Sequence, residues 1–505
     1  MDTETNLKEL TAILNEVADL TYAAALLGWD QQSYMPPGGS ANRGYQLATL
    51  AKIGHIKFTA PEVGQMLEDL KPWAAGLDQD SDEARLVKVA TREYKKQTKV
   101  PPEWLAEFTK ATSDAHLVWY QARKEDDFAK FLPLLEKIID LRRQYADFFA
   151  PYDHVYDPLL DDFEPGLKTA EVQEIFNALR PQQVELIKAI SESPQVDDSF
   201  LHQPFDEFRQ EEFGMEVITK YGYDWNRGRQ DRAPHPFTTS FGLGDVRITT
   251  RFIPDYLGSA LFSTLHEAGH AIYGQGCAPE LDRTQLAGGA SLAVHESQSR
   301  LYENILGRSY DFWTHFYGRL QELFPSQLSG VDLDTFYKGI NKVEPSLIRV
   351  EADEATYNLH IMLRLELEIA LMEGSIAAKD LPEAWNSRMD EYLGLTPPDD
   401  ADGVLQDVHW SSGYFGYFST YALGNLVSAQ LWETVNADIP NLADQIRGGE
   451  FAELTGWMHD KIHRHGAKFE PQELIERVTG SKIDSAAYLR YLKTKYTDVY
   501  GLKVN

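Results

Sequence analysis

One short run of the sequence, His-Glu-x-x-His from His266 to His270, constrains the structure of this chain more than any other. Residues four apart on an α-helix lie one turn above each other on the same face, so these two imidazoles can bind one metal ion. Glu267 is placed to reach a water molecule on that metal. The flanking residues are apolar or small, as in a buried helix. We therefore predict a helix over residues 261–275 that carries two zinc ligands and a general base.

A catalytic zinc has a third protein ligand and leaves its next position open to water. Glu296 is the preferred candidate, because it lies on the next expected helix, residues 291–304. His295 is adjacent, but neighbours on a helix point about 100° apart, so only one of the two faces the metal. Glu303, one to two turns further on, is the reserve candidate.

The periodicity of apolar residues predicts a mainly helical protein. Before the metal helix, the expected helices cover residues 6–30, 41–54, 60–70, 81–97, 101–123, 126–150 and 168–192. After it, they cover residues 291–304, 310–323, 333–342, 345–374, 381–392, 415–436, 440–448, 451–463 and 470–478. β-branched and aromatic residues on both sides of a Gly-Leu-Gly turn predict one small β-hairpin over residues 235–252, next to the metal helix.

The chain length and the absence of linker-like segments indicate the domain organisation. At 505 residues the chain exceeds the usual size of a single domain. It contains no Ser/Gly run, low-complexity tract or repeat that would mark a linker. We therefore expect one catalytic peptidase unit over residues 1–505, in which residues 1–220 and 221–505 can form two lobes around a long cleft.

The net charge indicates which classes of binding partner are disfavoured, and the cysteine content indicates the redox state of the compartment. A net charge of −30 and a pI near 4.8 argue against nucleic acid and against anionic membrane surfaces. The single cysteine, Cys277, excludes an internal disulfide and fits a reducing compartment. The first residues lack the pattern of a secretory signal, and no run approaches the roughly eighteen apolar residues of a membrane span. We expect a cytoplasmic protein without a membrane or nucleic-acid partner.

Six motifs between residues 235 and 410 resemble the M32 family of metallocarboxypeptidases, of the thermostable carboxypeptidase type. They stand in the expected order: His-Pro-Phe 235–237, Asp-Val-Arg-Ile-Thr 245–249, His-Glu-Ala-Gly-His 266–270, His-Glu-Ser-Gln 295–298, Ile-Arg-Val-Glu-Ala-Asp 348–353 and Gly-Val-Leu-Gln-Asp-Val-His-Trp 403–410. Two further stretches, residues 29–31 and 163–166, extend the similarity over nearly the whole chain.

This resemblance implies a mainly helical, cleft-forming homodimer that removes single residues from peptide C-termini. It also implies one zinc ion per chain, with cobalt as a possible substitute, and it supports Glu296 as the third ligand. In the thermolysin-like pattern an aspartate lies four residues after the ligand glutamate, whereas this chain has Arg300 there. The group that orients the metal histidines is therefore open, with Asp353 as one candidate.

The proposed reaction needs further side chains. Glu267 takes a proton from the attacking water and returns it to the leaving amine. A donor must also stabilise the charge that develops on the substrate carbonyl oxygen. His409, Tyr417 and Tyr421 lie in an aromatic-rich segment and are the candidates for this role, although each could equally serve packing.

An exopeptidase must also recognise the terminal carboxylate, for which the planar fork of an arginine is best suited. Arg349 is the first choice, because it interrupts an apolar run in which an unneeded charge would be costly. The structural alternative is an ion pair with Glu351 or Asp353. Arg247, on the expected hairpin, is the second choice.

His235 is expected to line the cleft, or else to hold the hairpin through a hydrogen bond. The leading hypothesis is a metal-dependent carboxypeptidase acting on peptides with a free C-terminus. A helical zinc oligopeptidase that cuts internal bonds is the alternative, because such enzymes share the His-Glu-x-x-His helix and a downstream glutamate. A non-catalytic scaffold with a structural zinc is disfavoured, because such sites commonly include cysteine and only Cys277 is present.

Overall fold

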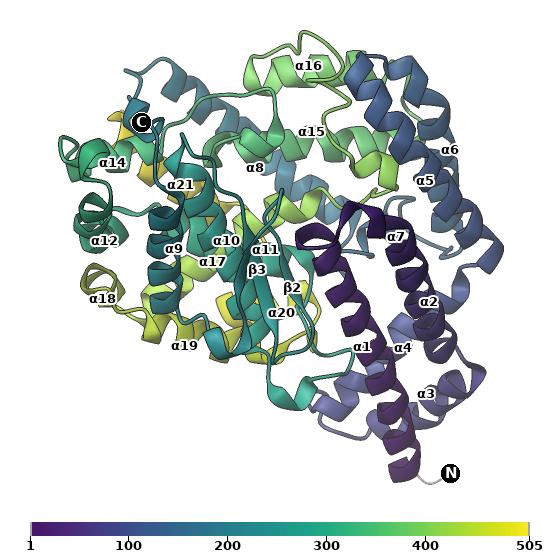
Figure 1. Ribbon diagram of the computed structural model, residues 1–505. Coiled ribbons are helices and arrows are strands. Elements are labelled where there is room, and N and C mark those ends of the chain that lie inside the picture. The colour runs from purple at the N-terminus through teal and green to yellow at the C-terminus, as the bar shows by residue number, and fades with distance from the viewer. Residues whose placement is uncertain (1–2, 503–505) are drawn as a thin grey trace.

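Helices form most of the protein in the computed structural model, which describes residues 3–502 (Figure 1). This confirms the mainly α class. The helices before the sheet are α1 (Thr3–Ser33), α2 (Ser40–Phe58), α3 (Pro61–Ala74), α4 (Asp82–Lys99), α5 (Pro102–Glu125), α6 (Phe128–Asp147), α7 (Asp157–Leu160), α8 (Thr169–Ser191) and α9 (Glu207–Tyr221).

The second half of the chain continues with the metal helix and the helices around it. They are α10 (Leu257–Gly276), α11 (Leu292–Arg300), α12 (Tyr310–Leu323), α13 (Pro325–Leu328), α14 (Leu333–Ile340), α15 (Glu354–Glu373), α16 (Leu381–Leu393), α17 (Ser419–Asp438), α18 (Leu442–Gly448), α19 (Ala452–Lys461), α20 (Pro471–Thr479) and α21 (Ala486–Tyr500). A π-helical turn, Leu301–Leu306, follows α11 directly.

A three-stranded sheet packs against α10, in the strand order β1-β3-β2 (Figure 1). Its strands are β1 (Gln230–Arg232), β2 (Thr238–Ser240) and β3 (Val246–Thr250). The antiparallel pair β2–β3 confirms the expected hairpin, with Thr238 opposite Ile248. β1 pairs in parallel with β3 and was not expected, because its three residues, Gln-Asp-Arg, carry no apolar alternation.

Some helix boundaries differ from those expected from the sequence. The helix predicted over residues 345–374 begins only at Glu354, because the Asp353 side chain accepts from the backbone N–H groups of Ala355 and Thr356 and caps the helix there. The residues before it form a loop with a short 3₁₀ turn, Arg349–Glu351. Helices α9 and α21 were not expected.

Two glycines let the helices of the metal site pack closely. A Cβ atom on Gly269 of α10 would lie 2.6 Å from the Gln298 carbonyl oxygen of α11. A Cβ atom on Gly424 of α17 would lie 2.5 Å from Cγ of Glu296, also on α11. Because real side-chain contacts of this kind are not that short, only glycine fits either position. The backbones of α10, α11 and α17 therefore meet at the predicted metal ligands.

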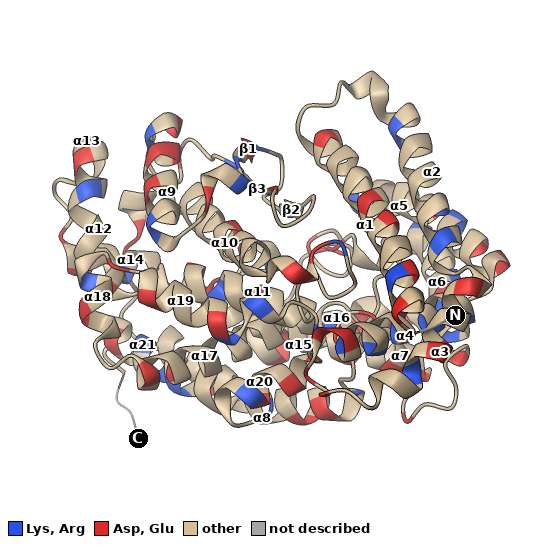
Figure 2. Ribbon diagram, turned by 90° about the horizontal axis from the view of Figure 1, so that it is seen from below, with Lys and Arg blue, Asp and Glu red and all other residues tan. Residues whose placement is uncertain are grey.

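The buried hydrophobic side chains form two clusters. The larger one draws on residues from Trp104 to Tyr500 and surrounds α10 and α11. The smaller one joins helices α1–α4 to the loop after α10, where Cys277, Leu281 and Leu286 contribute. Seen from below, α1 and α2 stand on one side of the small sheet, and α9 with α12 and α13 on the other (Figure 2). The division into lobes at residue 220 stays a prediction.

One described helix, α1, is long and apolar enough to cross a membrane by length and composition alone. Its most apolar window has a mean hydropathy of 1.3, and 11% of that window is buried. This corrects the expectation that no segment approaches this range, although α1 also contains Glu16 and Asp19. A single such helix near the N-terminus is weak evidence for a membrane span.

Candidate metal centre

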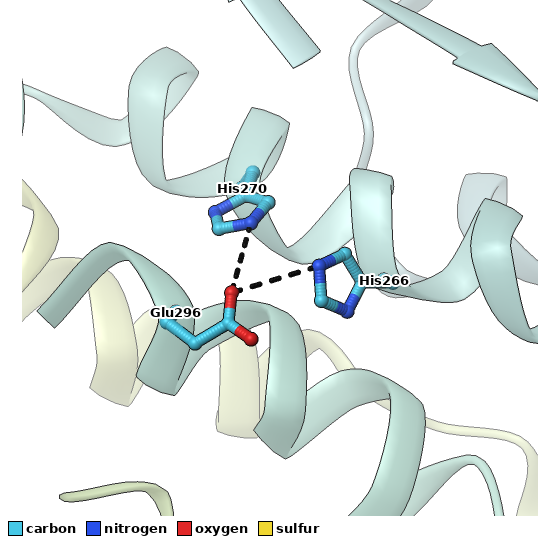
Figure 3. Close-up of side chains that lie close together, drawn as sticks. All are labelled: His266, His270 and Glu296. Carbon is cyan, nitrogen blue, oxygen red and sulfur yellow. Dashed lines mark ion pairs between the residues drawn. The ribbon is translucent and has the colours of Figure 1, made fainter. Parts of the chain in front are cut away.

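The three predicted metal ligands, His266, His270 and Glu296, converge on one point (Figure 3). Oε2 of Glu296 lies 3.6 Å from Nε2 of His266 and 3.5 Å from Nε2 of His270. One ligand atom from each of the three residues lies within 4.8 Å of the others. The two histidines come from successive turns of α10 and the glutamate from α11. Two imidazoles and one carboxylate fit a divalent metal with a position left open.

Both metal histidines are held by contacts to their other ring nitrogen. Nδ1 of His266 lies 2.8 Å from Oε2 of Glu303, in the π-helical turn. Nδ1 of His270 lies 3.3 Å from Nδ1 of His295. Because each Nδ1 atom is engaged, each Nε2 atom is left to face the metal position. The structure thus gives the orienting role to Glu303, and not to Asp353, which caps α15.

Arg300 forms ion pairs with both carboxylates of this site. Its Nε donates to Oε1 of Glu296 at 2.7 Å, and its Nη1 lies 3.3 Å from Oε2 of Glu303. Burial by itself raises the pKa of Glu303, but Arg300 and His266 outweigh it and lower the pKa to about 2. In the same way Arg300 and the two metal histidines hold the pKa of Glu296 well below its usual value, against burial. Both glutamates are therefore ionised near neutral pH.

Glu267 lies on the same turn as His266 and is buried, with 6% of its surface exposed. Its Oε2 accepts a hydrogen bond from the hydroxyl of Thr238 at 2.6 Å. The predicted general base is thus fixed between the metal helix and strand β2.

Arg349, the preferred carboxylate reader, is buried and paired with Asp407, not with Glu351 or Asp353. Its Nε and Nη2 donate to Oδ1 of Asp407 at 3.0 and 2.8 Å. Arg364 donates to the other oxygen of the same carboxylate at 2.7 Å. Burial raises the pKa of Asp407, but the two guanidiniums overcome this and hold it well below its usual value. Two positive charges share one negative charge, which leaves one net positive charge in the cluster.

The three candidate donors lie together beside this cluster. The hydroxyls of Tyr417 and Tyr421 are 3.4 Å apart, and the His409 ring centroid lies 5.4 Å from that of Tyr417. Burial lowers the pKa of His409 to about 4, so its ring is neutral near pH 7. Burial also raises the pKa of Tyr417, to which Glu296 and Arg349 make opposite contributions. The guanidinium of Arg349 lies 5.3 Å from the ring centroid of Tyr421, so the three side chains adjoin the Arg349 cluster.

Arg247 and His235 have different surroundings. Arg247 forms a two-point ion pair with Asp245. Its guanidinium also lies over the rings of Trp29 and Phe241, 4.6 and 4.9 Å from their centroids. It thereby joins the end of α1 to the hairpin. His235 is exposed on the loop before β2 and has no hydrogen-bond partner among the described residues. The structure does not bring either residue next to Arg349.

Three contributors to the site were not assigned these roles from the sequence. Thr238, His295 and Asp407 each contact a candidate site residue that is distant in the chain, so neither spacing nor periodicity indicates them. His295 and Asp407 do lie inside the His-Glu-Ser-Gln and Gln-Asp-Val-His motifs, which was the one available signal. The sequence suggested Glu303 only as a reserve ligand, whereas the structure places it in contact with the predicted ligand His266.

The chain is similar to known carboxypeptidases over nearly its whole length. The family model described as Carboxypeptidase Taq (M32) metallopeptidase matches residues 9–496. Thermostable carboxypeptidase 1 of Thermus thermophilus is 41% identical over 511 residues, covering 99% of this chain and all of that protein. Carboxypeptidase 1 of Bacillus subtilis is 37% identical, with 99% of this chain and 100% of that protein covered.

Solved structures show the same fold. The crystal structure of M32 carboxypeptidase from Deinococcus radiodurans R1 superposes with a TM-score of 0.96 at 40% sequence identity. That match covers 98% of this chain and 100% of the other. With the family model and the relatives, these matches show that the chain belongs to the carboxypeptidase Taq (M32) metallopeptidase family.

Proposed function

We propose that this metallopeptidase releases single C-terminal residues from peptides, with a zinc ion held by His266, His270 and Glu296. The observation that carries the proposal is the convergence of these three side chains. Glu267 lies next to them, on the same turn of α10 as His266. Membership of a carboxypeptidase family supports the reaction class. Cobalt is an expected substitute, because the same nitrogen and oxygen ligands accept it.

The side chains divide the work of peptide hydrolysis. A divalent metal in this site supplies Lewis acidity, which polarises the substrate carbonyl and makes water more acidic. Glu267 takes a proton from the attacking water and passes it to the leaving amine. Tyr417, Tyr421 and His409 are the donors proposed for the carbonyl oxygen, because they contact one another and because Arg349 lies 5.3 Å from the ring centroid of Tyr421.

The terminal carboxylate of the substrate is assigned to Arg349. Its cluster with Arg364 and Asp407 holds one surplus positive charge in a buried setting, where burying a charge without a partner is costly. An anionic substrate group would compensate that charge. The surplus favours an exopeptidase over the oligopeptidase alternative, which has no need of a cationic anchor. Arg247 is the second candidate, although Asp245 already neutralises it.

A paired set of variants tests the proposal. Glu267→Gln should retain one bound metal per chain while turnover falls by about 10²-fold or more, because the general base is lost. Arg349→Ala should lose activity on peptides with a free C-terminus, because the carboxylate anchor is lost. Full turnover in Glu267→Gln would remove that residue from the mechanism, and full activity in Arg349→Ala would favour the oligopeptidase.

We also propose that the chain forms a homodimer and acts in the cytoplasm, without nucleic-acid or membrane partners. The resemblance to the family motifs supports the dimer, and the net charge of −30 opposes binding to anionic surfaces. Light scattering should give twice the 57.3 kDa mass of the chain, and a monomeric mass would refute the dimer.

A further inference from the structure

The hydroxyl of Thr238 touches the proposed general base at two points. Its Oγ1 lies 2.6 Å from Oε2 of Glu267 and 2.9 Å from the backbone carbonyl oxygen of the same residue. A threonine hydroxyl has one hydrogen and can donate to only one of them at a time. The shorter distance lies in the range of charge-assisted O–H···O⁻ bonds, so the hydroxyl donates to the carboxylate.

This bond divides the two oxygens of the carboxylate between two tasks. Oε2 is held by Thr238, whereas Oε1 receives no hydrogen bond from any described residue. A carboxylate fixed through one oxygen cannot rotate freely about its last torsion. Oε1 therefore keeps one orientation and stays available for the proton of the attacking water.

Pairing in the sheet fixes the backbone position of Thr238. Thr238 pairs with Ile248 of the central strand β3, and Ile248 is fully buried where β3 packs on α10. One residue earlier, the Phe237 N–H donates to the hydroxyl of Thr249 at 2.9 Å. Side chains alternate between the two faces of a strand, so Thr238 faces α10 while Thr239, opposite Arg247, faces the other way.

We propose that Thr238 is a positioning residue that orients Glu267 for proton transfer. The proposal rests on the proposed role of Glu267 as general base. A purely structural role, in which Thr238 only ties β2 to α10, makes a different prediction. It expects losses in metal binding or stability and no special loss in kcat.

Two substitutions at this position separate the roles. Thr238→Val keeps the branched shape that suits a strand but removes the hydroxyl, whereas Thr238→Ser keeps the hydroxyl. We expect kcat of Thr238→Val to fall about tenfold or more with KM within about twofold, because a small misplacement of a catalytic group has a large effect on rate. Thr238→Ser should recover most of that loss. Thr239→Val, on the opposite face of the same strand, is the control and should keep the wild-type kcat.

The bound metal gives a readout that is independent of turnover. Thr238→Val should bind one metal ion per chain with the affinity of the wild type, because it leaves the three ligands untouched. Loss of metal, an unchanged kcat, or a Thr238→Ser variant as slow as Thr238→Val would each overturn the proposal.

A double variant separates this proposal from the one on which it rests. If Thr238 acts through Glu267, then adding Thr238→Val to Glu267→Gln should lower kcat no further, because contacting residues of one mechanism are not additive. A further tenfold loss would show that Thr238 acts independently and would overturn the inference. Full turnover of Glu267→Gln alone would refute the general base, whereas a slow Glu267→Gln beside a fast Thr238→Val would refute only the positioning role.

Discussion

The two metal histidines carry second contacts of different charge. Glu303 gives His266 an ionised carboxylate, while His295 gives His270 a neutral ring. The ring of His295 stays neutral because burial, with His270 beside it, lowers its pKa to about 3. A carboxylate on the far nitrogen makes an imidazole a stronger donor to a metal. His266 should therefore be the more strongly binding of the two histidines.

Removal of Glu303 tests this difference. We expect Glu303→Ala to weaken metal binding by about 10- to 100-fold, as is common for partners of metal-binding histidines. Glu303→Gln retains a hydrogen-bond acceptor without the charge, so its metal affinity should lie between those of Glu303→Ala and the wild type. The affinity is measured by competition with a chelator, with Glu280→Ala, an exposed position in the loop after α10, as control. Wild-type affinity in Glu303→Ala would contradict this account.

A second buried carboxyl supports the helix that carries Glu296. Glu164 is fully buried, and its Oε1 accepts from the Ala293 N–H in the first turn of α11 at 2.6 Å. Burial raises the pKa of Glu164 to about 8 against the opposing effect of that hydrogen bond. The native protein thus binds this proton at neutral pH, whereas the unfolded chain, with a pKa near 4.5, has released it.

The sign of the pH effect follows from proton binding. Between about pH 4.5 and pH 8 the native state holds one more proton than the unfolded state, so this group lowers stability as the pH rises, by up to about 1.4 kcal/mol per pH unit. Glu164→Gln is neutral at every pH and keeps an acceptor. Its melting temperature relative to the wild type should therefore increase from pH 5 to pH 8. A constant difference, like that expected for exposed Glu192→Gln, would refute the raised pKa.

At the scale of secondary-structure elements, the close packing of α17 against α11 fixes the position of Glu296, the predicted third ligand. Gly424 of α17 lies against Glu296, whereas Gly318 of α12 has no neighbouring atom within 4 Å of an added Cβ. Both glycines lie in the interior of a helix. An alanine has better helix propensity at either site, so the two positions separate propensity from packing.

We expect opposite results from the same substitution at these two positions. Gly318→Ala should stabilise the protein by about 0.5–1 kcal/mol through helix propensity. Gly424→Ala should destabilise it by about 1–3 kcal/mol, because the new methyl group must displace Glu296 or its helix. The displaced ligand should also weaken metal binding. Thermal melting and metal titration measure both effects, and wild-type metal affinity in Gly424→Ala would contradict the packing account.

The parts of the site that share one helix could be predicted from the sequence, and those that join distant elements could not. His266, Glu267 and His270 lie on successive turns of one helix, so helix geometry alone relates them. Glu296 required the further assumption that the next helix packs alongside. The contacts of Thr238 with Glu267 and of Asp407 with Arg349 depend on tertiary packing, which no periodicity reports.

The same limit applies to the secondary structure. The helix boundary at Glu354 was misplaced because the capping signal of Asp353 was outweighed by the apolar run before it. The edge strand β1 exists only through its pairing with β3. The long amphipathic helices and the Gly-Leu-Gly hairpin, in contrast, are specified by local sequence.

At the scale of the whole molecule, the C-terminal end of α1 contacts the small sheet beside the metal helix. Trp29, near the end of α1, makes an edge-to-face contact with Phe241 of the hairpin, and the guanidinium of Arg247 lies over its ring. Tyr34 donates to Asp231 of β1. The helices α1–α4 share a separate hydrophobic cluster with the loop after α10. Trp29 is therefore a link between α1 and the sheet beside the metal helix.

Removal of the Trp29 side chain should destabilise α1 and α2 and leave the rest of the protein unchanged. We expect Trp29→Ala to increase hydrogen exchange in α1 and α2, because a buried ring is removed at their only described aromatic contact with the hairpin. Exchange in α10 and α11, within the larger cluster, should stay slow. Tyr45→Ala, on the exposed face of α2, is the control. An equal increase throughout the protein would contradict the separate clusters.

Above all, we expect the protein to be a metal-dependent carboxypeptidase that recognises a free C-terminus. The most direct test is mass spectrometry of an N-blocked peptide of about five residues after incubation with zinc- or cobalt-loaded protein. The same peptide with a C-terminal amide is incubated in parallel, because an arginine anchor requires the free carboxylate. We predict stepwise loss of single residues from the free acid and no change in the amide. Internal cuts in both peptides would contradict the account and establish an oligopeptidase.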